Sequence, residues 1–166
     1  MHPFFGALPT GPMNSTTPPG MSARDLEAFL QQKIPLTQAM GLRVAETGAR
    51  LVLEAPLAAN VNHLGTAFGG SLHALPILAC YAAVWTLLFE AGLDGHVVVK
   101  RSSANYRQPV KGTLRAVCER PPPGLATEFI RDFRRHKKAR MDLTAVVEGD
   151  HGKPAVEFSG TFVAVG

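Results

Sequence analysis

The feature that most constrains this chain is an apolar run, residues 68–89, that contains no Lys, Arg, Asp or Glu. A polar segment with several glycines, residues 62–71, leads directly into it. A segment this apolar is either a membrane span or a helix that other parts of the protein cover on most sides. Because Pro76 removes one backbone hydrogen bond, the helix either bends there or has its regular part begin near Leu75.

The remainder of the chain predicts a helix before this run and strands on both sides of it. The expected elements are a helix begun by Ser22 and ended by Pro35, strands at 42–46 and 50–55, the apolar helix at about 70–91, strands at 96–106, 113–119, 140–149 and 155–164, and a short helix at 125–136. Alternating apolar and polar residues in the last two strands are typical of an antiparallel sheet with one packed face. We therefore expect an α+β fold in which an antiparallel sheet of about six strands surrounds one long hydrophobic helix. A membrane span would leave the strands without a core, so none is expected.

Composition narrows the organisation of the chain further. Residues 1–20 contain five prolines among Gly, Ser and Thr, which predicts a flexible leader before a single domain at 21–166. The two cysteines, Cys80 and Cys118, form no disulfide or zinc pattern, which favours a reducing, cytoplasmic location. Since no metal-ligand spacing is visible either, we expect neither a metal nor a redox cofactor.

The net charge of +4 comes from one cluster rather than from the whole surface. Residues 131–140 hold six basic side chains against a single acidic one, Asp132. Such a cluster is either a solvated helix face or a site for the phosphates of a small ligand, and its candidate ligands are Arg134, Arg135, Lys137 and Lys138. Nucleic-acid binding is not expected, because it would need aromatic side chains among the exposed Lys and Arg side chains. Phe129 and Phe133 fall instead on the apolar side of the predicted helix.

Three short motifs, together with this order of elements, resemble the hotdog acyl-CoA thioesterases. They are Asn62-x-x-Gly65-x-x-Phe68-Gly69-Gly70, then Ala91-Gly92-Leu93 before a strand, then Asn105-Tyr106-Arg107-Gln108-Pro109-Val110-x-Gly112. The likeness is greatest to the thioesterase domain that follows an acetyltransferase domain in some bacterial proteins. It extends over about residues 21–165, nearly the whole chain without the leader.

The resemblance implies a fold, an activity and an assembly. It implies a hotdog fold that hydrolyses an acyl thioester of coenzyme A or of acyl carrier protein, with coenzyme A present only as part of the substrate. It also implies a homodimer, or a dimer of dimers, formed by joining sheets, with each active site between a helix start and the partner subunit. The residues support part of this independently. Backbone N–H groups at Gly69 and Gly70, at the positive end of a helix dipole, would stabilise a thioester oxyanion.

Two departures from the family pattern bear on the chemistry. Phe68 stands where the family usually has His, and Ile77 stands where many members have the Asp or Glu that acts as base or nucleophile. The catalytic candidates are therefore Asn62, His63 and Gly70, and the substrate-binding candidates are Gly65, Phe68, Gly69, Ser71 and His73. Asn62 could instead serve loop hydrogen bonding, and Ser71 could cap the helix. The alternative function is a non-catalytic module that binds an acyl-CoA or a lipid.

Overall fold

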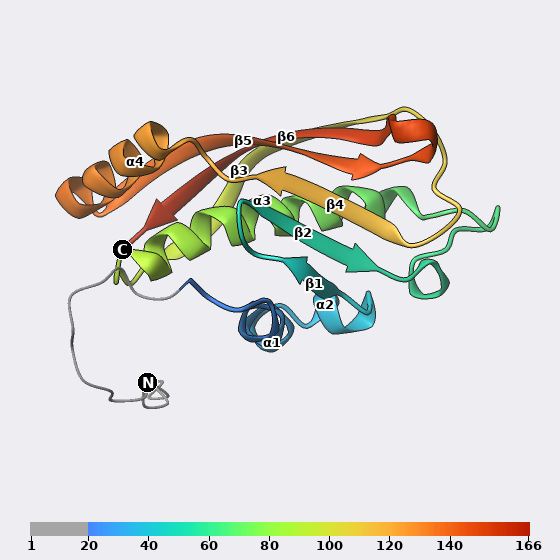
Figure 1. Cartoon of the computed structure of the whole chain (residues 1–166), viewed down its shortest axis with the longest axis horizontal. Helices are drawn as coiled ribbons and strands as arrows, with labels where there is room; N and C mark the ends of the chain where they lie inside the picture. The colour runs from blue at the N-terminus through green and yellow to red at the C-terminus, as the bar shows by residue number, and fades with distance from the viewer. Residues whose placement is uncertain (1–19) are drawn as a thin grey trace.

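The computed structural model describes residues 20–166, so the leader expected at residues 1–20 lies outside the described part except for Gly20. In chain order the elements are α1 (Ala23–Lys33), α2 (Leu36–Ala39), β1 (Arg43–Glu46), β2 (Arg50–Ala55), η1 (Leu57–Ala59), α3 (Gly69–Glu90), β3 (His96–Tyr106), β4 (Leu114–Glu119), α4 (Pro123–His136), β5 (Lys138–Glu148), η2 (Asp150–Gly152) and β6 (Pro154–Val165). The strands form a curved sheet around α3, with α1 and α2 beside β1 and α4 at one end (Figure 1).

The six strands make one antiparallel sheet in the order β1-β2-β4-β5-β6-β3. Burial alternates without exception along β5, and Val156, Phe158 and Phe162 of β6 are buried as the alternation predicted. The two edges of the sheet are β1 and β3, and β3 pairs only with β6. The expectation of about six antiparallel strands around one helix is confirmed.

Helix α3 is the core of the molecule rather than a segment outside it. Leu75, Ala79, Ala83 and Val84 have no exposed surface, and 61% of the most apolar window of the helix is buried inside the protein. The sheet therefore supplies the apolar surroundings that a membrane would otherwise supply. The helix runs without interruption from Gly69 through the buried Pro76, so the alternative of a regular helix beginning near Leu75 is wrong.

Local chemistry explains where the flanking helices begin and end. The hydroxyl of Ser22 accepts a hydrogen bond from the backbone N–H of Asp25 and caps α1 as expected. Pro35 separates α1 from the short helix α2, which was not expected from the sequence. At the end of α3, Glu90 lies where the helix dipole disfavours a negative charge. Arg120 compensates by donating two hydrogen bonds to its carboxylate, at 2.7 and 2.8 Å.

The central role of α3 predicts a large effect from truncating its buried side chains. Leu75→Ala leaves a cavity between helix and sheet, so the free energy of unfolding should fall by about 2–5 kcal/mol in urea titrations. Leu64→Ala is the matched control, because Leu64 is 73% exposed in the loop and its loss should change stability by less than about 0.5 kcal/mol. Equal effects of the two substitutions would contradict the placement of α3 in the core.

Candidate active site

The segment before α3 is anchored to its surroundings by backbone and side-chain hydrogen bonds. Val61 and Ala67 form an antiparallel bridge, and the N–H of Phe68 donates to the carbonyl of Asn60 at 2.7 Å. The Asn60 side chain is almost fully buried, and its amide donates to the carbonyls of Met40 and Pro56. These hydrogen bonds hold residues 60–68 in one conformation, and they therefore fix the position at which α3 begins.

The side chain of Asn62 makes all its observed hydrogen bonds within this loop. Its Oδ1 accepts from the N–H groups of Leu64 and Thr66, at 2.8 and 3.2 Å. Its Nδ2 donates to the Thr66 hydroxyl at 3.0 Å and to the Ala67 carbonyl at 3.3 Å. This pattern fits the loop-bonding role of an Asn in a turn. The neighbouring His63 and Gly65 are exposed, and Gly65 has the positive φ of 75° that favours glycine.

Helix α3 begins at Gly69 without a side-chain cap. Phe68 is the N-cap residue, with extended backbone and no side chain that could accept from the helix N–H groups, and Ser71 does not take that role. The Phe68 ring lies against Gly70, so that a Cβ on Gly70 would come within 2.3 Å of it. Since the first N–H groups of a helix have no intrahelical partner, the glycines leave amides available for a ligand at the positive end of the dipole.

One turn into the helix, His73 joins a chain of polar groups with β3. Its Nε2 lies 3.0 Å from the hydroxyl oxygen of Ser102, and its Nδ1 lies 3.5 Å from the hydroxyl oxygen of Tyr106. The Tyr106 hydroxyl also donates to the carbonyl of Gly69 at 3.1 Å. The ring of His73 packs edge-on against Phe158, with centroids 5.5 Å apart. These contacts hold the imidazole in one orientation beside the helix start.

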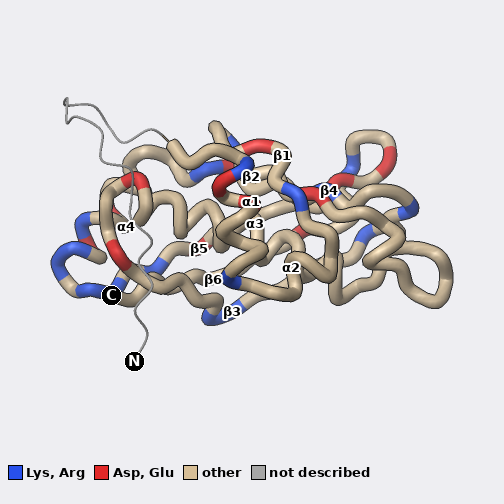
Figure 2. Tube along the Cα trace, turned by 90° about the horizontal axis from the view of Figure 1, so that it is seen from below, with Lys and Arg blue, Asp and Glu red and all other residues tan. Residues whose placement is uncertain are grey.

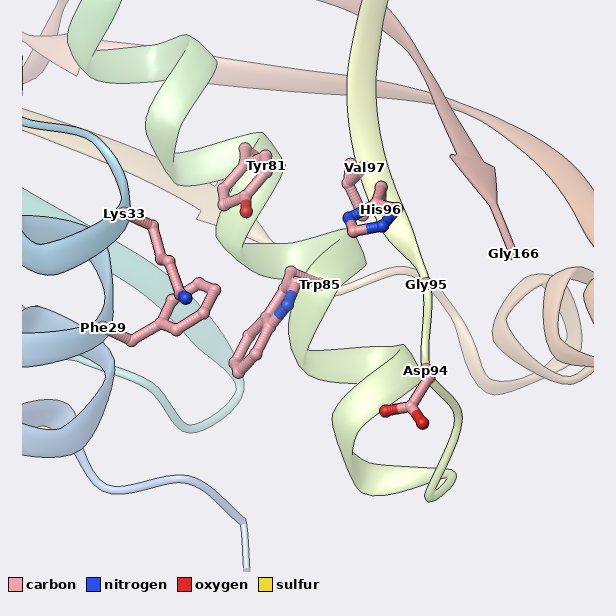
Figure 3. Close-up of a pocket in the computed structure, with 9 residues that line it drawn as sticks. All are labelled: Phe29, Lys33, Tyr81, Trp85, Asp94, Gly95, His96, Val97 and Gly166. Carbon is pink, nitrogen blue, oxygen red and sulfur yellow. The ribbon is translucent and has the colours of Figure 1, made fainter. Parts of the chain in front are cut away.

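A half-exposed apolar strip runs from this end of α3 to a cavity at the other. Residues Ala74, Ile77, Tyr81 and Trp85 lie along the strip. The cavity has a volume of about 550 Å³, and its lining includes Tyr81, Trp85, Phe29 and Val97. Tyr81 and Trp85 project from α3 toward Phe29 and Lys33 of α1, with His96 and Val97 of β3 across from them (Figure 3). Phe29 stacks on Trp85 with ring centroids 3.9 Å apart, which walls the cavity on one side.

The basic cluster lies at the opposite end of α3 from the loop. Arg134 and Arg135 are in the last turn of α4, and Lys137 and Lys138 follow it. All four are exposed, and the blue segments beside α4 and the C-terminus in Figure 2 mark this region. Because α3 has 22 residues, it separates the two ends by about 33 Å. Within one chain the structure therefore does not bring the basic cluster together with Asn62, His63 and Gly70.

No carboxylate of the described chain lies in α3 before Glu90, whose partner is Arg120 at the far end. Ile77, at the position where the resemblance to the hotdog thioesterases implies a carboxylate, is half-buried on the apolar strip. Cys80 is no substitute nucleophile, because its contact with the Cys118 thiol and its burial both raise the pKa of its thiol far above the ordinary value. A thiol that stays protonated is a weak nucleophile.

The structure thus gathers some of the predicted site residues and adds two others. Gly69, Gly70 and His73 lie together at the start of α3, and Asn62 organises the loop that leads there. Ser102 and the role of Tyr106 were missed, although Tyr106 belongs to a motif noted in the sequence. Their alternation in β3 places both on one face, but only the register against β6 and the contact with α3 show that this face meets His73.

The Asn62 geometry makes a prediction about the loop itself. Asn62→Ala removes the acceptor of the Leu64 and Thr66 amides, so their hydrogen exchange, measured by NMR, should accelerate about three- to tenfold. Asn62→Asp keeps an acceptor oxygen and should leave both amides close to their original rates. Unchanged exchange in Asn62→Ala would show that the loop does not depend on this side chain.

Comparison with known proteins places this architecture in a family. Residues 23–166 match a sequence model of the family described as "Putative thioesterase (yiiD_Cterm)". A protein of unknown function from Chlorobaculum tepidum TLS is 33% identical, covers 86% of this chain and 93% of its own, and superposes with a TM-score of 0.83. For a putative thioesterase from Shewanella oneidensis the identity is 26%, the coverage 87% and 97%, and the TM-score 0.77. A thioesterase from Haemophilus influenzae, 13% identical over 87% of this chain and 91% of its own, shares the fold with a TM-score of 0.66. The chain has the hotdog fold and belongs to this putative thioesterase family.

Proposed function

We propose that this protein hydrolyses thioesters of apolar acyl groups carried by coenzyme A or acyl carrier protein. The observation that carries the proposal is the start of α3, where Phe68 provides no side-chain cap and the first two helical residues, Gly69 and Gly70, have no side chain beside their backbone N–H groups. An oxyanion that develops on a thioester carbonyl is stabilised by amides placed in this way. Membership of a thioesterase family supports the same reaction.

The acyl group would lie along the apolar strip of α3. Gly70 and Trp85 are fifteen residues apart on this helix, a distance of about 22 Å. The strip carries no charged side chain, and it ends at the aromatic cavity of about 550 Å³. Burial of an extended hydrocarbon chain along such a surface is favourable, at roughly 0.8 kcal/mol for each CH₂ group. We therefore propose medium to long acyl chains as the substrates.

A homodimer joined through β3 would bring the basic cluster to the active site. The free edge of β3 exposes Val98 (52%) and Val99 (43%), which favours pairing with another strand. β3 runs opposite to α3, because Tyr106 contacts Gly69 whereas His96 lines the cavity beside Trp85. An antiparallel, two-fold pairing of two β3 strands therefore sets the far end of one subunit beside the α3 start of the other.

That pairing gives the basic cluster a function. The far end of each subunit carries α4, since Gly95 lies against Phe133 and the end of α3 borders Arg134 and Arg135. Basic side chains of the partner subunit would then flank the helix start and bind the phosphates of coenzyme A, or the acidic surface of a carrier protein. In this proposal Asn62 shapes the loop, while the exposed His63 lies at the rim. The two free, buried thiols agree with a cytoplasmic location.

A matched pair of substitutions at Gly70 tests the role of the backbone amide. Gly70→Pro deletes one N–H in the first helical turn, where proline is tolerated, whereas Gly70→Ala keeps the N–H and makes the same collision with the Phe68 ring. We expect kcat for acyl-CoA hydrolysis to be about a hundredfold lower in Gly70→Pro than in Gly70→Ala. Thiol release is followed with substrates from acetyl to palmitoyl, on coenzyme A and on acyl carrier protein.

Two results of this assay would contradict the proposal in different ways. Equal turnover of the two Gly70 variants, with unchanged melting temperatures, would remove the oxyanion role. Tight binding of acyl-CoA without any thiol release in the unmodified protein would favour the non-catalytic module, for which the absence of a carboxylate at Ile77 is the supporting observation.

The dimer is tested by charge at the free edge of β3. We expect light scattering to give the unmodified protein twice the chain mass of 17.7 kDa. The double variant Val98→Glu, Val99→Glu should have the mass of a single chain, because like charges across paired strands repel. Val146→Glu is the control, since Val146 is an exposed valine within the interior strand β5. A dimer that survives the double substitution would place the interface elsewhere.

A further inference from the structure

We propose that Ser102 attacks the thioester carbonyl and that His73 takes its proton, so that hydrolysis passes through an acyl-serine. This inference rests on the thioesterase activity proposed above and deepens it by naming the reacting groups. It is carried by the chain of contacts from Ser102 to His73, 3.0 Å at Nε2, and from His73 to Tyr106, 3.5 Å at Nδ1. A nucleophile and a base within hydrogen-bond reach, with the base held by a third group, is the arrangement that this chemistry requires.

Counting protons along the chain fixes the direction of each hydrogen bond. The Tyr106 hydroxyl has one proton, which it donates to the carbonyl of Gly69, so toward His73 it can only accept. We therefore assign the imidazole proton to Nδ1, which leaves the lone pair on Nε2. Ser102 therefore donates its hydroxyl proton to Nε2, and this is the bond along which a base withdraws the proton of a nucleophile.

An irregularity in β3 is what aims Ser102 at the helix. The register against β6 passes from Val99 opposite Phe162 to Arg101 opposite Thr161, so Lys100 is an extra residue. Before this bulge the odd-numbered Val97 is buried whereas His96 and Val98 are exposed. After it the even-numbered Ser102 and Tyr106 contact α3. If Lys100 were instead paired with Thr161 in regular register, Ser102 would lie opposite Ser159 and point to the other face. Bulges of this kind occur preferentially next to active sites.

The surroundings allow a substrate to reach the pair. Ser102 and His73 are both half-buried, and His73 lies one helical turn from the exposed Gly70. The edge-on contact with the Phe158 ring restricts the orientation of the His73 imidazole. The neighbouring Ser103 has no histidine beside its hydroxyl. That hydroxyl points to the opposite face of the sheet and contacts the hydroxyl of Ser159 at 3.0 Å.

The reaction balances with water as the only co-reactant. Ser102 Oγ forms a bond to the carbonyl carbon while its proton passes to His73 Nε2. The C–S bond then breaks, and the leaving thiolate takes that proton and departs as the thiol. Water attacks the resulting ester with His73 again accepting a proton, which returns to Ser102 Oγ as the carboxylic acid leaves. Tyr106 acts as a positioning residue that keeps the lone pair of His73 on Nε2.

The test combines trapping of the intermediate with matched serine variants of the full chain. Rapid acid quench with an acyl-CoA, followed by peptide mass spectrometry, should find the acyl group on Ser102. Ser102→Ala should abolish this adduct and lower kcat at least a hundredfold, and His73→Gln should lower it by a similar factor, while Ser103→Ala retains both adduct and rate. Tyr106→Phe should lower the acylation rate constant in single-turnover experiments without changing the affinity for substrate.

The outcomes separate this inference from the proposed function. Full turnover by Ser102→Ala, with its far-ultraviolet dichroism unchanged, would overturn the acyl-serine route while leaving the thioesterase activity standing. An adduct on Ser103 as readily as on Ser102 would overturn it too. If the unmodified protein shows neither adduct nor thiol release with any acyl-CoA or acyl carrier protein substrate, both the inference and the proposed function fail.

Discussion

The apolar surface of α3 can leave water only if the sheet closes around it, and the rest of the structure follows from that requirement. Strands with one apolar face, such as β5, turn that face to the helix, and the β-sheet curves because it must cover a cylinder (Figure 1). Burial of apolar side chains supplies most of the favourable free energy of folding. The single acidic group of the helix, Glu90, is accommodated only because it lies at the end, where Arg120 meets it.

A helix enclosed in this way has few places where chemistry can occur. Its side chains in the middle are buried and apolar, whereas its first turn emerges from the sheet and presents backbone amides that no side chain caps. The candidate site is therefore made of backbone groups and the His73 side chain of α3, together with side chains from the nearest strand edge. β3 is that edge, and its irregularity at Lys100 turns Ser102 and Tyr106 toward His73.

Ile77 stands where the resemblance to the hotdog thioesterases implies a carboxylate, and its side chain is half-buried on the apolar strip of α3. A carboxylate there would lie on the half-buried strip where the acyl chain is proposed to bind. An isoleucine at this place extends the apolar surface toward Tyr81 and leaves activation of a nucleophile to another residue. Histidine suits that task at neutral pH, since its unperturbed pKa lies close to the working range.

The sequence by itself determined the fold class, because the lack of charge in residues 68–89 and the alternation in the strands depend only on residue order. It also indicated Gly69, Gly70 and His73, whose residue types stand out in an apolar segment. Only the tertiary structure decided that the Asn62 side chain makes its hydrogen bonds within the loop, that Ser102 faces His73, and that the basic cluster lies at the far end of α3. These depend on strand register, on one bulge residue and on the length of a helix between two sites, and none of them leaves a periodic signal in the chain.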